Sequence, residues 1–225
     1  MITFYFNGSP NPTKVALFLE EAGLPYEAVA VDTRKGEQFA PDFLKLNPNG
    51  KVPVLVDDGQ VVFDSNAILL YLAEKTGRFL PPSSERAALL SWLMFVATGI
   101  GPFSGQAVHF RNFAPEKVPY ANERYQYEAK RHYGVLDRHL AEHEWMVGEA
   151  YGIVDMAVWG WARMLPFVMG EDAYADLPNV KRHVDAIAAR PAAAKAVALK
   201  DRFTFKAEFD AEARGHMFKH LAKAG

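Results

Sequence analysis

The stretch Asn47-Pro-Asn-Gly-Lys-Val-Pro-Val-Leu-Val56 decides the fold of the first part of the chain. Proline cannot donate to a sheet ladder, so Pro53 must open its strand, with Val52 held extended before it. This leaves the Val52 N–H and C=O free. A cis Val52–Pro53 bond would turn these groups outward, where they could pair with an extended, peptide-like ligand. An ordinary strand start with a trans bond is the other interpretation that the residues allow.

Strand and helix signals alternate on both sides of this stretch. Apolar alternation predicts the strands, and 3.6-residue periodicity with terminal glycine or proline predicts the helices. The expected elements are a strand over 2–6, a helix over 14–22, a strand over 27–31, a short helix over 41–46, a hairpin of 53–56 and 61–63 around Asp58-Gly59, and a helix over 65–76. The predicted order is βαβαββα, an α/β fold.

The chain after this region is helical in period. A break over 77–84, which contains Pro81-Pro82, predicts a linker. The expected helices cover 85–112, 120–143, 153–169, 178–189 and 192–200. Apolar residues among the charges after Asp201 predict a tail that packs on the body of the protein. We therefore expect domains over 1–78 and 85–225, with a linker over 79–84.

Composition limits the function. The chain has 225 residues, a formal net charge of −2 and 50% hydrophobic residues, which predicts a globular protein and makes nucleic acid an improbable partner. With neither a basic leader nor an apolar stretch of spanning length, we expect a cytoplasmic protein without a membrane partner. There is no cysteine, which excludes a disulfide, a thiolate metal site and a protein thiol nucleophile. Any thiol chemistry must come with a ligand.

Two turns offer polar groups to such a ligand. A helix start at Ser65 would present N–H groups to a carboxylate, and Asp64 would take an ammonium group. Simple capping of the helix by Ser65 is the alternative. Ser9 and Asn11 lie just before the first helix, where a hydroxyl or amide donor and the positive helix end could lower the pKa of a bound thiol. Both could equally be ordinary turn residues.

Metal binding is not expected. His139 with His143 and His216 with His220 have the i,i+4 spacing of paired ligands, but neither pair has an evident third ligand. Solvated helix faces explain both pairs. His109 is best explained as structural, and the aromatic stretch over 92–110 as core packing.

Several short motifs together resemble the cytosolic glutathione transferases, and most of all the bacterial nu-class, disulfide-bond-reductase-like group. The resemblance covers nearly the whole chain and implies a thioredoxin-like N-terminal domain, an all-helical C-terminal domain and a homodimer. The motifs are Ser9-Pro-Asn11, Lys35-Gly-Glu-Gln-Phe39, the stretch from Asn47 to Pro53, Ala67-Ile-Leu-Leu-Tyr-Leu-Ala-Glu-Lys-Thr-Gly77, Gly101-Pro102, Gly105-Gln106, Pro119-Tyr120 and Glu123-Arg-Tyr-Gln126.

The resemblance also implies site roles. Ser9 stands where the nu-class group has threonine and keeps its hydroxyl, and Asn11 matches an asparagine. These two would stabilise the glutathione thiolate. The implied glutathione-binding residues are Val52 with a cis Pro53 for the cysteinyl backbone, Asp64 and Ser65 for the γ-glutamyl end, Gln38 and Lys51 along the groove, and Arg131 reaching across the dimer.

The sequence departs from the family pattern at two places. Pro12 follows Asn11 where the nearest relatives tend to have glycine, so the backbone of this loop can differ. The Ser/Thr-x-x-Asp capping box appears as Gly152-Ile-Val-Asp155, in which Asp155 can still serve the helix start but glycine has no side-chain acceptor.

The expected function is that of an enzyme that uses the thiolate of bound glutathione to reduce a small-molecule second substrate, either a disulfide or a peroxide. Conjugation of glutathione to hydrophobic electrophiles is one alternative. A scaffold or sensor without turnover is the other, because fold alone does not fix function.

Overall fold

The computed structural model describes residues 1–220, and these form two compact units. The first unit joins Met1–Tyr71 to the segment that starts at Ala194, and the second unit is Leu72–Ala193. The domain boundaries expected at residues 78 and 85 stay a prediction.

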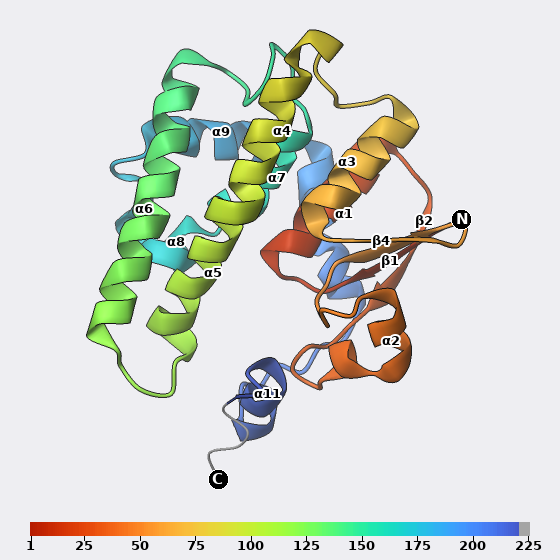
Figure 1. Cartoon of the computed structure of the whole chain (residues 1–225), viewed down its shortest axis with the longest axis vertical. Helices are drawn as coiled ribbons and strands as arrows, with labels where there is room; N and C mark the ends of the chain where they lie inside the picture. Colours follow the sequence, from red (N-terminus) through yellow and green to blue (C-terminus); the bar gives the residue numbers. More distant parts are fainter. Residues whose placement is uncertain (221–225) are drawn as a thin grey trace. The chain divides into compact units, whose positions relative to one another are not determined.

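A four-stranded mixed sheet forms the centre of the first unit (Figure 1). The strands are β1 (Ile2–Phe6), β2 (Tyr26–Ala30), β3 (Val54–Asp57) and β4 (Gln60–Phe63), in the order β2-β1-β3-β4. β1 pairs parallel to β2 and antiparallel to β3, and β3 pairs antiparallel to β4. The predicted α/β order and the hairpin around Asp58-Gly59 are confirmed.

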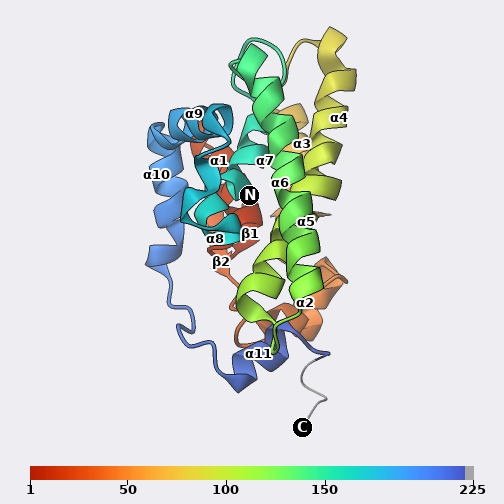
Figure 2. The same cartoon turned by 90° about the vertical axis from the view of Figure 1, so that its left-hand side faces the viewer.

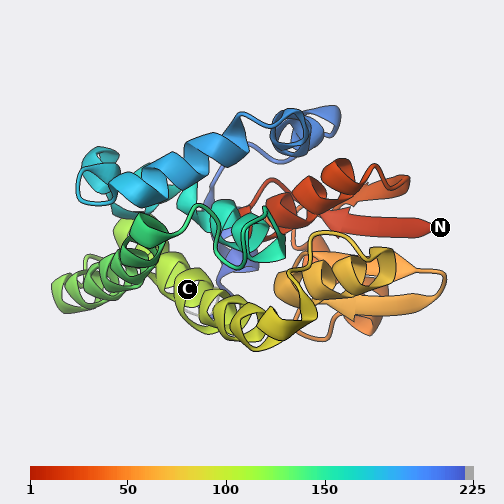
Figure 3. The same cartoon turned by 90° about the horizontal axis from the view of Figure 1, so that it is seen from above.

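Helices cover both faces of this sheet. α1 (Pro10–Ala22) and α3 (Ser65–Thr76) lie side by side over one face, and α2 (Pro41–Leu46) lies on the other (Figures 1 and 3). α1 starts four residues before the expected position. Pro10 and Pro12 fall in its first turn, where the missing N–H groups have no helical partner to lose. The helix ends, as predicted, at Gly23, whose φ is 63°.

The second unit is built of helices. Its elements are the end of α3, α4 (Arg86–Phe95), a π-helical turn (Val96–Ile100), α5 (Gly101–Val108), a second π-helical turn (His109–Phe113), α6 (Pro119–Glu142), α7 (Ile153–Ala162), α8 (Leu165–Met169), α9 (Pro178–Ala188) and the first part of α10 (Pro191–Ala198). The run of α4 and α5 lies beside α6 (Figure 2). The expected helices are confirmed, except that the one over 153–169 is interrupted between α7 and α8.

The first π-helical turn accommodates a histidine ring. A Cβ on Gly99 would lie 2.5 Å from Cδ2 of His132, so only glycine permits this approach. The His132 ring stacks on Phe103 at 4.8 Å and lies 5.3 Å from Phe95. Much of the aromatic stretch over 92–110 is therefore engaged in ring packing.

Asp155 serves the start of α7, as expected. Its Oδ2 accepts the N–H of Gly152 at 2.8 Å, and its Oδ1 accepts both the N–H of Met146 and Nε2 of His183 at 2.8 Å. The carboxylate is fully buried. Three donors thus compensate its desolvation, and the glycine at the start of the box removes only one of the usual capping bonds.

One helical run contradicts the expectation that no apolar stretch reaches spanning length. The 31 residues of Ser83–Phe113 include an 18-residue window of mean hydropathy 1.5. Neither α4 nor α5 is long enough to span a membrane, but the π-helical turns join them into one continuous helical run. Leu89, Leu93 and Ile100 of this run are buried inside the protein. Core helices of globular domains pass the same test of length and composition, so the run carries no membrane assignment.

The C-terminal segment packs on the first unit, as expected. It comprises the end of α10, a 3₁₀ turn (Leu199–Arg202), an extended stretch and α11 (Ala211–Met217). Phe203 and Phe205 place their rings edge-on to Phe6 of β1, with centroids 5.2 and 6.2 Å away. The last five residues of the expected domain over 85–225 lie outside the described residues.

Candidate functional site

Asn7, in the loop before α1, holds Ser9 in place, a role that the sequence did not predict. Oδ1 of Asn7 accepts the backbone N–H of Ser9 at 3.0 Å and the hydroxyl of Ser9 at 2.6 Å. Because a backbone N–H can only donate, the Asn7 atom is an acceptor, and the Ser9 hydroxyl must donate to it. The hydroxyl proton of Ser9 therefore points at Asn7, while the side chain itself is exposed.

The start of α1 lacks a side-chain cap. Ser9 is the N-cap residue with an extended backbone, but its hydroxyl bonds Asn7 instead of the helix. The carbonyl of Ser9 accepts both the N–H and the hydroxyl of Thr13, at 3.2 and 2.9 Å. Asn11 lies half-buried in the first turn. The positive end of the helix dipole is thus not offset by an acidic side chain, which favours an anion such as a thiolate there.

Asn47 organises the loop that leads to Pro53. This buried side chain donates from Nδ2 to the Lys51 carbonyl at 2.7 Å and accepts the Asn49 N–H at 3.0 Å. The Val52–Pro53 bond is cis, in agreement with the resemblance. Within residues 1–220, the N–H and C=O of Val52 have no hydrogen-bond partner.

The turn between β4 and α3 is capped by Asp64, not by Ser65. Oδ1 of Asp64 accepts the N–H groups of Asn66 and Ala67, at 2.8 and 3.1 Å. Asp64 itself is exposed and has a φ of 72°, a left-handed conformation that aspartate tolerates better than most residues. Ser65 is the buried first residue of α3, and its N–H has no partner among the described residues. The helix start therefore keeps one donor, and Asp64 keeps one exposed carboxylate oxygen.

A buried lysine supports this turn and was also missed. Lys14 of α1 is 1% exposed, and its Nζ donates to Oδ1 of Asn66 at 2.7 Å. Burial lowers the pKa of Lys14 to about 7, and the charge of nearby Asp64 acts in the opposite direction. An ammonium group that titrates near neutrality thus lies beneath the γ-glutamyl end of the expected site.

Gln38 lies under the C-terminal segment. Its side chain is 4% exposed, with Nε2 donating to the Thr33 carbonyl at 3.3 Å and to the His216 carbonyl at 3.4 Å. Oε1 of Gln38 is buried and has no partner. Lys51, by contrast, is exposed.

Arg131 belongs to the second unit, whereas the other predicted site residues belong to the first. It is half-exposed on α6, and its Nε donates to Oε2 of Glu128 at 2.9 Å. The hydrogen bond and charge of Arg131 hold the pKa of Glu128 below its usual range. A carboxylate on the same helix therefore holds the guanidinium in one orientation.

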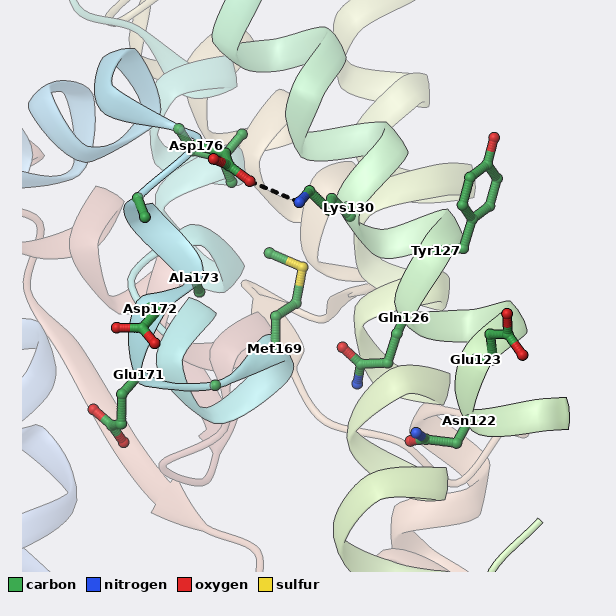
Figure 4. A pocket seen from close by; sticks show the side chains of 13 residues that line it. Asn122, Glu123, Gln126, Tyr127, Lys130, Met169, Glu171, Asp172, Ala173 and Asp176 are labelled. Carbon is green, nitrogen blue, oxygen red and sulfur yellow. Dashed lines mark hydrogen bonds and ion pairs between the residues drawn. The ribbon is translucent and has the colours of Figure 1, made fainter. Parts of the chain in front are cut away.

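Each unit contains a large cavity. The cavity of the first unit, about 660 Å³, is bounded by the loop containing Ser9, the residues after β2 and the C-terminal segment. The cavity of the second unit, about 720 Å³, lies between α6 and the turn after α8, where Lys130 pairs with Asp176 at 2.7 Å (Figure 4). No predicted site residue lines the second cavity.

The histidine pairs make ordinary local contacts, but the expectation of solvated helix faces is wrong: half-buried His139 lies 4.4 Å from the Trp92 ring, and His220 lies beyond the end of α11. His139 bonds the Met146 carbonyl and stacks on His143 at 4.3 Å, and His216 lies 3.7 Å from Glu212. Within residues 1–220, no three His, Cys, Asp or Glu side chains come together as metal ligands would.

The mixed sheet with its cis-proline loop, joined to a helical unit, defines the glutathione-transferase class of fold. The chain matches the family model for the glutathione S-transferase N-terminal domain over residues 1–74 and the model for the C-terminal domain over residues 102–191. It belongs to the glutathione S-transferase family.

Three members of this family are similar to the chain over most of its length. The disulfide-bond oxidoreductase YfcG of Escherichia coli K12 is 45% identical over 205 residues, which are 88% of this chain and 94% of that protein. A glutathione transferase family member from Pseudomonas fluorescens, solved with two glutathione bound, has a TM-score of 0.83 and 41% identity. The match covers 87% of this chain and 92% of that one. A Pseudomonas putida glutathione transferase with one glutathione disulfide bound per subunit has a TM-score of 0.82, 38% identity and coverage of 87% and 90%.

Proposed function

We propose that this protein reduces small-molecule disulfides with glutathione, using the thiolate of the bound tripeptide as the nucleophile. The observation that carries the proposal is the set of unpaired groups in the first unit. Val52 offers an N–H and a C=O, Ser65 offers an N–H, and Asp64 offers a carboxylate oxygen. An extended peptide with an amino-acid head matches this set, and no cysteine competes as nucleophile.

Each part of glutathione has a partner in this proposal. The cysteinyl backbone pairs with Val52 as an added strand. The γ-glutamyl carboxylate accepts the N–H of Ser65 at the positive end of α3, and the γ-glutamyl ammonium binds Asp64. Gln38 and Lys51 line the glycyl side.

The thiolate lies at the start of α1 in this proposal, near Ser9 and Asn11. The hydroxyl of Ser9 donates to Asn7 in the free protein, so it must turn to the sulfur when the thiolate binds. A donated hydrogen bond and a positive helix end both favour the ionised thiol.

The reaction proceeds by two exchanges. The glutathione thiolate attacks one sulfur of the disulfide, the S–S bond breaks, and the leaving thiolate takes a proton from solvent. A second glutathione thiolate then attacks the mixed disulfide, releases the other half as a thiol and forms glutathione disulfide. One disulfide and two glutathiones thus give two thiols and one glutathione disulfide.

Assembly and location form part of the same proposal. We infer a cytoplasmic homodimer that uses no metal, in which Arg131, oriented by Glu128, reaches the glutathione of the partner subunit. Sedimentation velocity with and without glutathione tests the dimer. An Arg131→Met variant that dimerises but binds glutathione as the wild type does would remove that role.

Two assays test the function. We expect glutathione-dependent reduction of 2-hydroxyethyl disulfide above the solution rate, and glutathione binding by calorimetry. Conjugation of 1-chloro-2,4-dinitrobenzene without disulfide reduction would favour a conjugating transferase. Binding without either activity would indicate a sensor, and no binding would indicate a scaffold.

A further inference from the structure

We propose that the cavity of the first unit is the site for the disulfide substrate and that it selects disulfides carrying carboxylates. This inference rests on the proposed function. Ser9 lines this cavity, so the residue assigned to the thiolate also faces the space in front of it. A disulfide in the cavity can therefore meet the sulfur of glutathione.

Three cations line the cavity: Arg34, Lys200 and Lys206. Lys206 is neutralised, because its Nζ pairs with Asp210 at 2.9 Å and with Glu212 at 2.6 Å. The other two keep donors for a ligand. Nη1 of Arg34 donates to the carbonyls of Lys206 and Ala207, and the guanidinium lies 6.0 Å from the Phe209 ring, which leaves its Nε and Nη2 donors for a ligand. The nearest acid to Lys200 is Asp201 at 3.9 Å, which also lines the cavity.

The acid at the base of the cavity is already satisfied. Asp32 is 4% exposed, its Oδ1 accepts the N–H of Arg34 at 3.0 Å, and its Oδ2 accepts the N–H of Lys206 at 2.6 Å. These bonds tie the C-terminal segment to the end of β2. They also leave the buried carboxylate little capacity to attract a cationic ligand. The remaining charges of the lining are then Arg34, Lys200 and one acid, Asp201, so cations outnumber acids there.

Packing holds Lys200 beside the loop that contains Ser9. A Cβ on Gly8 would lie 2.9 Å from Cδ of Lys200, so the lysine stem runs across the bare Cα of this glycine. Gly8 directly precedes Ser9. The ammonium group is therefore carried along the same loop, although half of the side chain is exposed.

Apolar side chains line the same cavity. Phe203, Phe205 and Met217 line the cavity, and the two phenylalanine rings are fixed against Phe6. Rings and methylenes accommodate the carbon and sulfur atoms of a disulfide, while Arg34 and Lys200 bind its carboxylates. A positive field also stabilises the thiolate that leaves when the S–S bond breaks.

A charge series of small disulfides tests the proposal. The probes are dithiodiglycolate, 2-hydroxyethyl disulfide and cystamine, which are anionic, neutral and cationic. For each, kcat/KM is divided by the rate constant of the same reaction with glutathione in solution. We expect this enhancement to be largest for the anion and smallest for the cation, with about a tenfold step between anion and neutral probe that shrinks as salt increases.

Matched lysine variants assign the effect to Lys200. Lys200→Met keeps the stem and removes the charge, and we expect the anion-to-neutral ratio to fall by about tenfold. Lys200→Arg should restore the ratio. Lys195→Met is the control, because Lys195 is also exposed in the C-terminal segment but does not line the cavity; its ratio should equal that of the wild type.

The outcomes separate the two proposals. Glutathione-dependent reduction of all three disulfides without a preference for the anion, or an unchanged ratio in Lys200→Met, would overturn the carboxylate-selective site and leave the proposed function standing. Failure to bind glutathione or to accelerate any of the three would overturn both.

Discussion

The two helices that start at the proposed glutathione site start in different ways. At α3, Asp64 caps the helix with its own carboxylate, and buried Lys14 donates to Asn66, two residues further along the chain. At α1, no side chain caps the helix, and the hydroxyl of Ser9 turns back to Asn7. The first start is fixed by internal bonds, whereas the second keeps its positive end uncompensated and a hydroxyl that can be redirected.

This difference matches two tasks of the proposed glutathione site. The γ-glutamyl end of glutathione needs a rigid set of partners that recognises an amino-acid head. The sulfur needs a positive electric field and a hydrogen-bond donor that can turn toward it when the thiol ionises. We expect changes at the α3 start to affect stability and affinity, and changes at the α1 start to affect the ionisation of the thiol.

The largest effect should come from Lys14→Met, as a change in the pH dependence of stability. The folded pKa of Lys14 is lowered to about 7, so the unfolded chain binds more protons between pH 7 and 10.5 and the free energy of unfolding rises with pH there. The slope is at most about 1.4 kcal/mol per pH unit, which makes the whole change a few kcal/mol. Urea denaturation of both proteins from pH 6 to 10 measures it.

Subtracting the free energy of unfolding of Lys14→Met from that of the wild type cancels the contributions of the other titrating groups. This difference should increase from pH 7 upward. Lys45→Met is the matched control, because that ammonium is exposed in a surface ion pair with Asp42. A flat difference for Lys14→Met would mean that the buried amine does not titrate with folding.

Asp64→Ala should have the next largest effect. It removes the cap of α3, which costs about 1 kcal/mol of stability, and the partner of the glutathione ammonium. Loss of one charged hydrogen bond predicts a dissociation constant for glutathione raised about 10- to 100-fold by calorimetry. Asp64→Asn retains the capping oxygen and should keep the stability while losing most of the affinity. Equal affinity in all three proteins would contradict the assignment.

Ser9→Ala should act on the thiol and spare the fold. Without the hydroxyl donor, the pKa of bound glutathione should rise by about one unit, and disulfide reduction at neutral pH should fall about tenfold. The ultraviolet absorption of the thiolate, followed against pH, measures the pKa. Ser9→Thr keeps the hydroxyl and should remain close to the wild type. A rise in the dissociation constant with no change in thiol pKa would place Ser9 in binding only.

Asn7→Ala should give the smallest effect and the opposite sign. Once the acceptor is removed, the Ser9 hydroxyl is free to donate to the thiolate, and the pKa of bound glutathione should fall by a few tenths of a unit. Thr33→Val is the control, since it removes only the 3.4 Å contact to Nδ2 of Asn7. A raised pKa in Asn7→Ala would mean that Asn7 acts chiefly by ordering the loop.

Local patterns predicted most of the fold. The alternation of strand and helix signals, Pro53 before its strand and Asp58-Gly59 in the hairpin gave the order that the structure has. The start of α1 was missed because the helical period begins only at Lys14, although proline is well suited to a first turn. The need for glycine at position 99 comes from the His132 ring of α6, which the local sequence does not contain.

The site was predicted less completely, because its supports come from distant residues. In the sequence, nothing distinguishes Lys14 from a solvent-exposed lysine of a helix. Its hydrogen bond to Asn66, 52 residues away, is visible only in the structure. The grouping of the C-terminal segment with the sheet rests on Asp32 and Arg34, about 170 positions earlier in the chain. One local signal was available. Asn7, Asp32, Asn47 and Asp64 each accept the N–H two residues on, the common Asx turn.

If the thiolate binds at Ser9 as proposed, the bond between Ser9 and Asn7 makes this loop distinguish the ionised from the neutral thiol. A neutral thiol is a weak acceptor and cannot draw the hydroxyl away from an amide oxygen 2.6 Å distant. An ionised sulfur can, because hydrogen bonds to charged acceptors are roughly twice as strong as neutral ones. We therefore expect the Ser9 loop to rearrange only when glutathione binds as the thiolate, and to keep its free-state geometry when the neutral thiol binds.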